Sequence, residues 1–303
     1  MKGVTAAFSS CLFFGLYPVF NKVLVGEIAP LALAAITSVF AGLLLLAILG
    51  VKHRVGEIAK LSLGQAIMLA TVALFGGVIA QVLFLNGLME STATNAALLT
   101  RVEGLLMALL GVIVLKEKVT SSQIMGTGVM VFGTAVIVTK AFTASVQFAR
   151  GDLLIVLASG SWALANIIMK KNLSDISPEL VIVTRHLMAG IILMMLVGTH
   201  IPLDFDGKAW LHMSGLVVFV LLIGQYLWYF ALEHTSAANV AMASLATPLL
   251  GVVYSVVLLG ETLSSYQIWG GALMVAGLAM VEIHMGTIHN LEHRIRSLHL
   301  PIH

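Results

Sequence analysis

Long apolar runs dominate the chain, and the short breaks between them hold charged residues, glycine or proline. The runs are continuous, whereas the strands of a membrane barrel would alternate apolar and polar positions. Roughly 20 apolar residues allow an α-helix to cross a bilayer with its backbone hydrogen bonds satisfied. The pattern therefore predicts about ten membrane-spanning helices. They are expected at residues 4–25, 30–51, 65–89, 93–115, 121–141, 151–171, 178–198, 211–232, 238–259 and 265–284.

The composition is that of a chain whose solvent is mostly lipid. Hydrophobic residues make up 59% of the sequence and charged residues 10%, whereas a soluble domain is about half apolar and about a quarter charged. The predicted fold class is therefore an all-α integral membrane protein. The first run is too long for the core of a secretory signal peptide and no cleavage site precedes a soluble sequence, so we expect it to remain as the first span.

The placement of lysine and arginine predicts the orientation, because cytoplasmic loops carry an excess of both. A cytoplasmic N-terminus puts most of them inside, which favours a multi-pass inner (plasma) membrane protein with both termini in the cytoplasm. The basic residues are scattered at loop ends, so a nucleic-acid partner is not expected. The inside positions would hold Lys2, Lys52, Arg54, Lys60, Lys116, Lys118, Lys170, Lys171, Arg294 and Arg296, and the outside positions Lys22, Lys140, Arg150 and Lys208.

The two halves of the sequence repeat. Gln81 and Gln225 are 144 residues apart, and the same offset relates further pairs through the second part of each half. The front of each half aligns at an offset of 148 residues, as from Lys22 to Lys170. We therefore expect a first repeat at 1–143, a second repeat at 148–284 and a cytoplasmic amphipathic tail at 285–303. The other matched pairs are Asn95 with Asn239, Glu117 with Glu261, Gln123 with Gln267, Gly126 with Gly270, Gly133 with Gly277, Pro30 with Pro178 and Gly42 with Gly190.

Each predicted repeat holds five spans, and five is an odd number. The second repeat must then enter the membrane from the side opposite to the first. Such inverted repeats allow one central site to face each side of the membrane in turn. The repeat pattern therefore predicts a transporter that works by alternating access.

Two segments resemble the EamA repeats of the drug/metabolite transporter superfamily. They are "SGSWALANIIMKKNLSDISPELVIVTRHLMAG" (159–190) and "SAANVAMASLATPLLGVVYSVVLLGETLSSYQIWGGALMVAGL" (236–278). The first half departs from the pattern, with Phe14 in place of the tryptophan, Thr37 in place of the arginine and Gly104 in place of the proline. The resemblance implies a transporter with a central cavity among spans one, three, four, six, eight and nine. It leaves the substrate open, since the superfamily carries amino acids, nucleotide-linked sugars, nucleosides, polyamines and drugs.

Arg101 and Glu103 lie inside the apolar run at 93–115, where a charge costs at least ~2.5 kcal/mol on insertion scales. Residues two apart on a helix point to nearly opposite sides, so these two should not pair and at most one should face the cavity squarely. Their counterparts in the second repeat are Leu245 and Thr247. Because the scaffold does not need them twice, we expect Arg101 to bind an anionic group and Glu103 to bind an ammonium or a coupling proton. Pairing with polar groups of other spans is the alternative.

Other polar and aromatic residues in the predicted spans suit a mostly apolar pocket with a few polar groups. Hydrogen bonds between helices are the alternative for each of them. Residues at recurrent positions, or glycines spaced for close helix packing, are expected to be structural, and a homodimer is left open. The pocket candidates are Tyr17, Gln81, Asn86, Trp162, Asn166, Gln225, Tyr226, Trp228 and Tyr229, and the structural candidates are Glu117, Glu261, Arg185, Pro248, Gly126, Gly133, Gly270 and Gly277.

The predicted function is secondary-active transport, outward, of an amino acid or a related zwitterion or organic anion. A multidrug exporter is the first alternative, although the middle of the first span carries no acidic residue to bind a cationic drug. A carrier of nucleotide-linked or phosphorylated solutes, a membrane receptor and a membrane enzyme are the others. No phosphate loop, nucleophile elbow or zinc-protease motif occurs, and Cys11 is the single cysteine. We therefore expect no enzyme activity, no cofactor and no metal.

Overall fold

The computed structural model describes residues 2–115, 121–141, 149–173, 175–198, 205–235, 240 and 243–280, and these residues form helices and no strands. Within them, 7 helical stretches are long and apolar enough to cross a membrane, and Ile124–Val138 and Ala246–Leu259 are shorter apolar helices. An all-α membrane protein is therefore confirmed, while the number of ten spans stays a prediction. The tail at 285–303 lies outside the described residues.

Most helices are α-helices, but one short 3₁₀ helix and two π-helical stretches interrupt them. In the first half the elements are α1 (Lys2–Gly15), α2 (Tyr17–Leu24), α3 (Pro30–Val51), the 3₁₀ helix η1 (Val55–Lys60), α4 (Leu63–Val72), the π stretch η2 (Ala73–Ile79), α5 (Ala80–Glu90), α6 (Ala93–Leu99), α7 (Val102–Leu115) and α8 (Ser121–Val138). In the second half they are α9 (Arg150–Asn172), α10 (Pro178–Val197), α11 (Gly207–Gly215), the π stretch η3 (Leu216–Gly224), α12 (Gln225–His234), α14 (Ala246–Leu259) and a last helix at 265–280.

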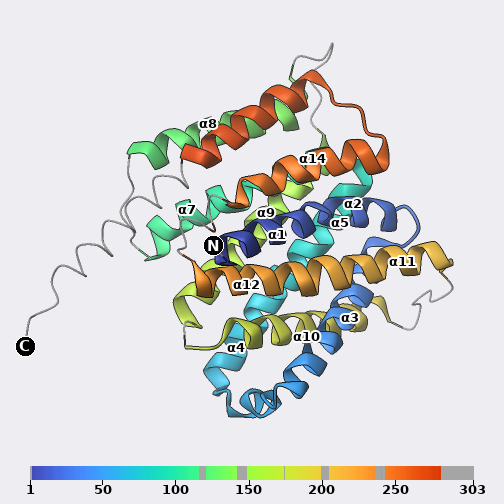
Figure 1. Ribbon diagram of the computed structural model, residues 1–303, viewed down its shortest axis with the longest axis vertical. Coiled ribbons are helices and arrows are strands. Elements are labelled where there is room, and N and C mark those ends of the chain that lie inside the picture. Colours follow the sequence, from blue (N-terminus) through green and yellow to red (C-terminus); the bar gives the residue numbers. More distant parts are fainter. Residues whose placement is uncertain are drawn as a thin grey trace, which may run out of the picture.

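Helices of one half pack mainly against helices of the other. The most extensive contacts join α3 to α10, α5 to α9 and α1 to α12. Figure 1 shows α8 beside the last helix at one end of the molecule, and α3 with α10 towards the other end. The helices α1, α5, α9 and α12 lie between these two pairs (Figure 1).

Contacts of two glycine residues show that the two halves pack on each other symmetrically, so that the same contact occurs twice. A Cβ atom at Gly42 would lie 3.1 Å from the backbone nitrogen of Leu187, and one at Gly190 would lie 3.1 Å from the backbone nitrogen of Val39. Each partner is 148 residues from its counterpart, so exchanging the halves reproduces the contact. This reciprocity is the signature of a twofold relation between similar units.

The four glycines expected to be structural lie face to face within the chain. A Cβ atom at Gly133 would lie 2.7 Å from the carbonyl oxygen of Gly270, and one at Gly277 would lie 2.6 Å from that of Gly126. Small residues let helix backbones approach closely in lipid, where dispersion replaces the hydrophobic effect as the force between helices. These glycines therefore join α8 to the last helix.

Two of the predicted continuous spans are broken. Leu16 separates α1 from α2, and the proline at position 18 has no N–H to continue the α-helical ladder. Thr100 and Arg101 separate α6 from α7, with tight three-residue bonds from Arg101 N to the Leu98 oxygen (3.0 Å) and from Gly104 N to the Arg101 oxygen (3.1 Å). Lys2–Leu24 and Ala93–Val114 are nevertheless each long and apolar enough to cross a membrane, so the spans predicted at 4–25 and 93–115 agree with the structure and each contains one break.

The second half repeats the break at Arg101 but not the one at Leu16, because α9 continues without interruption from Arg150 to Asn172. A turn at Leu245, the counterpart of Arg101, precedes α14. The π stretches η2 and η3 also occupy equivalent positions, since 144 residues added to 73–79 give 217–223. A π-helical turn inside an α-helix is frequent at functional sites because it changes the backbone bonding locally.

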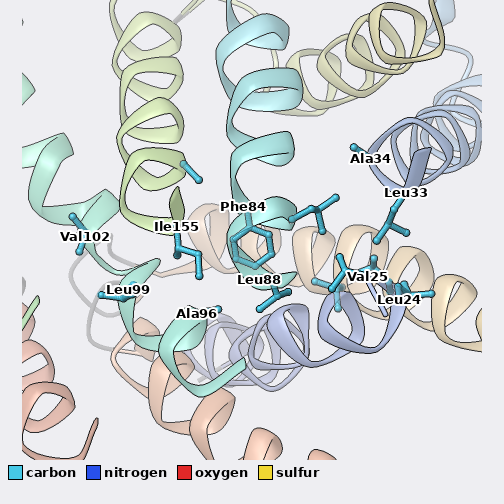
Figure 2. Packing of buried hydrophobic residues seen from close by; sticks show 14 of the residues in the cluster. Leu24, Val25, Leu33, Ala34, Phe84, Leu88, Ala96, Leu99, Val102 and Ile155 are labelled. Atoms are coloured by element: carbon cyan, nitrogen blue, oxygen red, sulfur yellow. The ribbon is translucent and has the colours of Figure 1, made fainter. Parts of the chain in front are cut away.

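The hydrophobic core lies between α2, α3, α5, α6 and α9. Phe84 and Leu88 of α5 are fully buried against Ile155 of α9, and Leu99 of α6 is fully buried nearby. Figure 2 shows the side chains of Phe84 and Leu88 in the space between these helices and Leu24. This core fixes the end of α6, and with it the position of the break at Arg101.

A charged cluster outside the spans ties the loop after α3 to α10. Arg54 donates to Glu179 (2.5 Å) and Glu57 (2.7 Å), and Lys52 donates to Glu179 (2.7 Å). The hydrogen bond with Arg54 lowers the pKa of the Glu57 carboxyl, and the same bond raises the pKa of Arg54. The contribution of Glu57 to stability is thus present above its unfolded pKa and is lost as the pH falls through its lower folded pKa.

Candidate substrate-binding cavity

A cavity of about 390 Å³ lies where the helix breaks and the π stretches meet. Its wall comes from α1, α2, η2, α5, the α6–α7 break, α9, η3, α12 and α14, which matches the spans that the resemblance implies. Spans two and seven add to it through Thr37 and Ser38 of α3 and Arg185 and His186 of α10. The cavity falls within the range of about 300–1,000 Å³ that small-molecule sites occupy.

Arg101 and Glu103 both line the cavity. That at most one of them faces it squarely stays a prediction, and Glu103 also contacts a neighbouring helix, since it accepts a hydrogen bond from Asn166 of α9. Arg101 lies in the break between α6 and α7, and Glu103 is in the first turn of α7.

Glu103 is the carboxylate of a small polar cluster. Its Oε1 accepts a hydrogen bond from Asn166 Nδ2 at 2.7 Å, and the charges of Arg101 and Arg185 both act on it. Among the described residues, neither arginine forms an ion pair within 4.0 Å. Arg101 Nε is buried without a hydrogen-bond partner. An unpaired guanidinium nitrogen beside a cavity is costly unless a bound group satisfies it.

The polar residues belong to one side of the internal twofold. Arg185 and its counterpart Thr37 both line the cavity, and so do His186 and its counterpart Ser38. The same holds for Glu103 and Thr247, for Asn166 and Pro18, and for Trp162 and Phe14. In each pair the charged or more polar member comes from α7, α9 or α10. The cavity therefore has a polar pole at these helices and a neutral pole formed by the counterpart residues in α1, α2, α3 and α14.

Aromatic rings surround the cavity. The Tyr17 and Trp162 rings are 6.4 Å apart, and the Phe14 and Trp228 rings are 6.1 Å apart, both edge to face. Tyr17 also donates a hydrogen bond to Gln81 Oε1 at 2.8 Å. The Oε1 of Gln225, the counterpart of Gln81, is buried without a partner. These rings offer flat apolar surface around a few polar groups.

Two side chains of α9 hold the first π stretch in place. Trp162 Nε1 donates to the Gly76 carbonyl at 3.0 Å, and Ser161 Oγ donates to the Phe75 carbonyl at 2.8 Å. Their counterparts, Phe14 and Phe13, have no polar hydrogen to donate to η3. The contact of η2 with α9 is therefore polar, whereas the contact of η3 with α1 is apolar.

The remaining candidates lie elsewhere. Asn86 donates to the Val82 carbonyl of its own helix at 2.7 Å and is not among the cavity-lining residues. Tyr226 is 59% exposed and lines a second cavity of about 270 Å³ between α3, α10 and α12, which shares Ile182 and Gln225 with the first. The side chain of Tyr229 lies outside the described residues.

Glu261 binds across the two halves. Its carboxylate accepts from Ala93 N (2.7 Å) and Thr94 N (2.9 Å), so it caps α6 instead of the helix that follows it. Gly260, with φ of 68°, ends α14 in a left-handed turn that redirects the chain. Glu117 lies outside the described residues, and Pro248 is in the first turn of α14 next to the cavity residue Thr247.

The main omissions from the predicted pocket were Arg185 and His186, since Arg185 was assigned to the scaffold. Both line the cavity, and His186 Nε2 is buried without a partner. The comparison between halves that singled out Arg101 would have found them, because their counterparts are Thr37 and Ser38.

Comparison with known proteins identifies the family to which the chain belongs. The model of the EamA-like transporter family matches residues 1–139 and 149–283. An uncharacterized transporter of Methanothermobacter thermautotrophicus is 26% identical over 294 residues, 91% of this chain and 84% of its own length.

Two further relatives carry more specific names. A probable amino-acid metabolite efflux pump of Salmonella typhimurium is 26% identical over 195 residues, 60% of this chain and 65% of its own length. The riboflavin transporter ImpX of Fusobacterium nucleatum is 26% identical over 253 residues, 79% of this chain and 84% of its own. These names describe different cargoes.

A solved structure titled "Crystal structure of protein" has a similar fold. It superposes with a TM-score of 0.66, covers 93% of this chain and 96% of its own, and is 17% identical. At that identity the likeness supports the fold alone.

Proposed function

Because this chain belongs to the EamA-like transporter family, we propose that it is a secondary-active exporter of a small amino-acid-like zwitterion or organic anion. The substrate would bind in the central cavity, and two inverted repeats would expose it to each side of the membrane in turn. Arg101 would bind the carboxylate, and Glu103 the ammonium group.

The observation that supports this substrate class is the charge of the cavity. Two arginines and one carboxylate line it, so the polar pole carries net positive charge when all three are ionised. The buried Nε of Arg101 has no partner. A planar guanidinium fork matches a carboxylate, which can accept two of its hydrogen bonds at once.

The neutral pole suits the rest of such a molecule. Phe14 belongs to this pole, and the ring of Trp228 packs edge to face on it. A substrate with a carboxylate and an amine at one end and an apolar side chain at the other would satisfy both poles. The name of the Salmonella relative agrees with this class, and the name of the Fusobacterium relative makes riboflavin the main competitor.

Alternating access is supported by the arrangement of the halves. The reciprocal glycine contacts relate them by exchange, and broken helices at equivalent positions border the cavity. Discontinuous helices at a repeat interface form the binding site in several transporter folds.

The first experiment is a thermal-shift screen of the purified protein with amino acids, organic anions, nucleosides and riboflavin. Flux of each stabilising ligand into proteoliposomes follows. We expect amino acids or organic anions to stabilise the protein and to be transported. Stabilisation by riboflavin alone, or binding without flux, would contradict the proposal.

The matched variants are Arg101→Gln in the cavity and Arg150→Gln at the start of α9, where the side chain is 79% exposed. Losing a hydrogen-bonded charge pair costs about 2–5 kcal/mol, and each 1.4 kcal/mol is a factor of ten. Arg101→Gln should therefore weaken substrate binding by at least about tenfold. Arg150→Gln should bind as the wild type does. Unchanged flux in Arg101→Gln would refute the role of Arg101.

A further inference from the structure

A second buried carboxylate lies away from the cavity, at the beginning of α9. Asp152 is fully buried, and its side chain accepts hydrogen bonds from Asn95 Nδ2 at 3.0 and 2.9 Å and from the Ser91 hydroxyl. No basic side chain lies within 4.0 Å of it in the described part of the chain. A buried carboxylate without a cation next to it is expensive when ionised, and a proton removes the charge.

Asp152 belongs to a network that joins the two halves. Asn95 accepts a hydrogen bond from Gln267 at 2.7 Å, and Gln267 also donates to Thr92 Oγ1 at 3.2 Å. Ser91, Thr92 and Asn95 are in the first half, whereas Asp152 and Gln267 are in the second. Opening this end of the molecule would separate these partners.

Two further contacts close the same end. Lys22 Nζ donates to the carbonyls of Leu88 (2.7 Å) and Ser91 (2.6 Å) at the end of α5. Glu261 caps α6 from the other half, as described above. The predicted orientation places this end on the outer face of the membrane.

The network is also linked to the cavity through α6. All seven residues of α6 are buried, so this short helix has little freedom to move apart from its neighbours. Its first turn holds Asn95, and its last residue, Leu99, is followed directly by the break at Thr100 and Arg101. A displacement of Asn95 would therefore move α6 as a unit and change the position of Arg101.

The carboxylate has no equivalent in the other half. The front of each half aligns at an offset of 148, which pairs Gly151 with Gly3 and Asp152 with Val4. Gly3 and Gly151 occupy equivalent places, since a Cβ atom at Gly3 would lie 2.7 Å from His234 C and one at Gly151 would lie 2.8 Å from Glu90 C. A carboxyl group is thus present at one end of the molecule and replaced by an apolar side chain at the other.

We propose that Asp152 is a proton-binding residue that couples closure of the outer end to a proton gradient directed into the cell. When this end opens, water reaches Asp152, and a proton from the external solution adds to one carboxylate oxygen to give the neutral acid. The neutral acid is buried again as the end closes, donating to Ser91 and still accepting from Asn95. The cycle is completed when the inner end opens and the proton leaves the carboxyl group for the cytoplasm, which restores the carboxylate. The proposal rests on the proposed function, because transport is what the proton would drive.

Several charged or titratable groups surround Asp152. Lys140, just after α8, interacts electrostatically with the Asp152 carboxyl group without touching it, and so does Tyr266 of the last helix. Glu90 of α5 lies 3.6 Å from Arg150, and Glu261 also acts on Tyr266. No titratable side chain occurs in α6, which supplies the direct contact.

The direct test needs no substrate. Infrared difference spectra of the purified protein between alkaline and acidic pH would record the C=O band of a buried protonated carboxyl group. We expect a band that Asp152→Asn removes and that persists in Asp206→Asn, which changes an exposed carboxylate that caps α11. Asp152→Asn keeps the shape and a hydrogen-bonding group, so it imitates the protonated state. A spectrum unchanged in Asp152→Asn would overturn the proposal.

The transport test separates coupling from movement. Asp152→Asn should lose accumulation driven by a proton gradient while keeping exchange of labelled for unlabelled substrate across the membrane. Glu103→Gln, the competing proton site, should lose substrate binding in both assays. Loss of exchange together with accumulation in Asp152→Asn, or full accumulation, would refute coupling at Asp152. If the wild type transported nothing, the proposed function would fail, and the infrared result on Asp152 would still stand or fall by itself.

Discussion

At the residue scale, the chain places its charges where the internal symmetry is broken. Arg101, Glu103 and Arg185 line the cavity, and their counterparts Leu245, Thr247 and Thr37 are neutral. A protein built from two similar halves can use one scaffold twice and still bind an asymmetric molecule if only one half carries the charged groups. The comparison between halves is therefore a guide to binding residues in a chain of this kind.

The separate roles of Arg101 and Glu103 lead to a prediction. Glu103→Gln should weaken binding of an amino acid by at least about tenfold, since a charged hydrogen bond contributes about 1.5–3 kcal/mol. Binding of the same molecule without its amine should be retained or strengthened, because the competing negative charge is gone. Isothermal titration calorimetry with an amino acid and with the same molecule lacking its amine measures the two affinities. Glu57→Gln, in a partly buried ion pair away from the cavity, is the control, and an equal loss for both ligands in Glu103→Gln would contradict an ammonium-binding role.

At the element scale, short interruptions of helices shape the site. The breaks at Leu16 and Arg101 and the stretches η2 and η3 all border the cavity. Irregular backbone at membrane depth is tolerated where it lines a cavity and is avoided where it faces lipid. The regular helices outside, such as α8, serve to hold these segments.

The packing of α8 on the last helix predicts opposite effects of one substitution at two sites. Gly133→Ala places a Cβ atom 2.7 Å from the Gly270 carbonyl oxygen and should destabilise the protein by about 1–3 kcal/mol through overpacking. Gly128→Ala, on the same helix, meets nothing within 4 Å and should be neutral or stabilise by up to about 1 kcal/mol through helix propensity. Thermal unfolding of the two purified variants compares them. Equal melting temperatures would show that the close contact is absent.

At the scale of the whole molecule, the exchangeable contacts and the proposed inverted repeats make the two ends of the protein similar. The orientation of the chain in the membrane then decides which end faces the outside. The distribution of lysine and arginine predicts that the loop after α3 lies in the cytoplasm and the loop before α11 lies outside. Each of these regions has a glycine with open space around it, Gly56 in η1 and Gly207 at the first position of α11.

Cysteine labelling tests this orientation in cells. With Cys11→Ser as the background, Gly207→Cys should react with a membrane-impermeant maleimide added outside, and Gly56→Cys should react only after the membrane is opened. The opposite result would mean that the N-terminus is outside, and it would move the Asp152 network to the cytoplasmic face. Reaction of the unaltered chain at Cys11, which is buried, would mark a misfolded preparation.

The sequence by itself determined the class of the protein, the repeat and the asymmetric positions. Continuous apolar runs leave only helices in lipid, because each backbone group must be satisfied within its own segment. The offsets of 144 and 148 residues identify equivalent positions without any coordinates, and this is why Arg101 and Glu103 stood out. The family match confirmed the resemblance on which the expected cavity was based.

Only the tertiary structure decided which of these positions meet. Arg101 and Glu103 line one cavity, with Arg101 in the break between α6 and α7, and periodicity cannot show a break that depends on one tight turn. Glu261 caps α6 instead of its own following helix, and Asp152 meets Asn95 from the other half, because long-range packing brings distant segments together. Apolar periodicity reports which residues avoid water, whereas contacts between polar groups in lipid depend on where each helix ends.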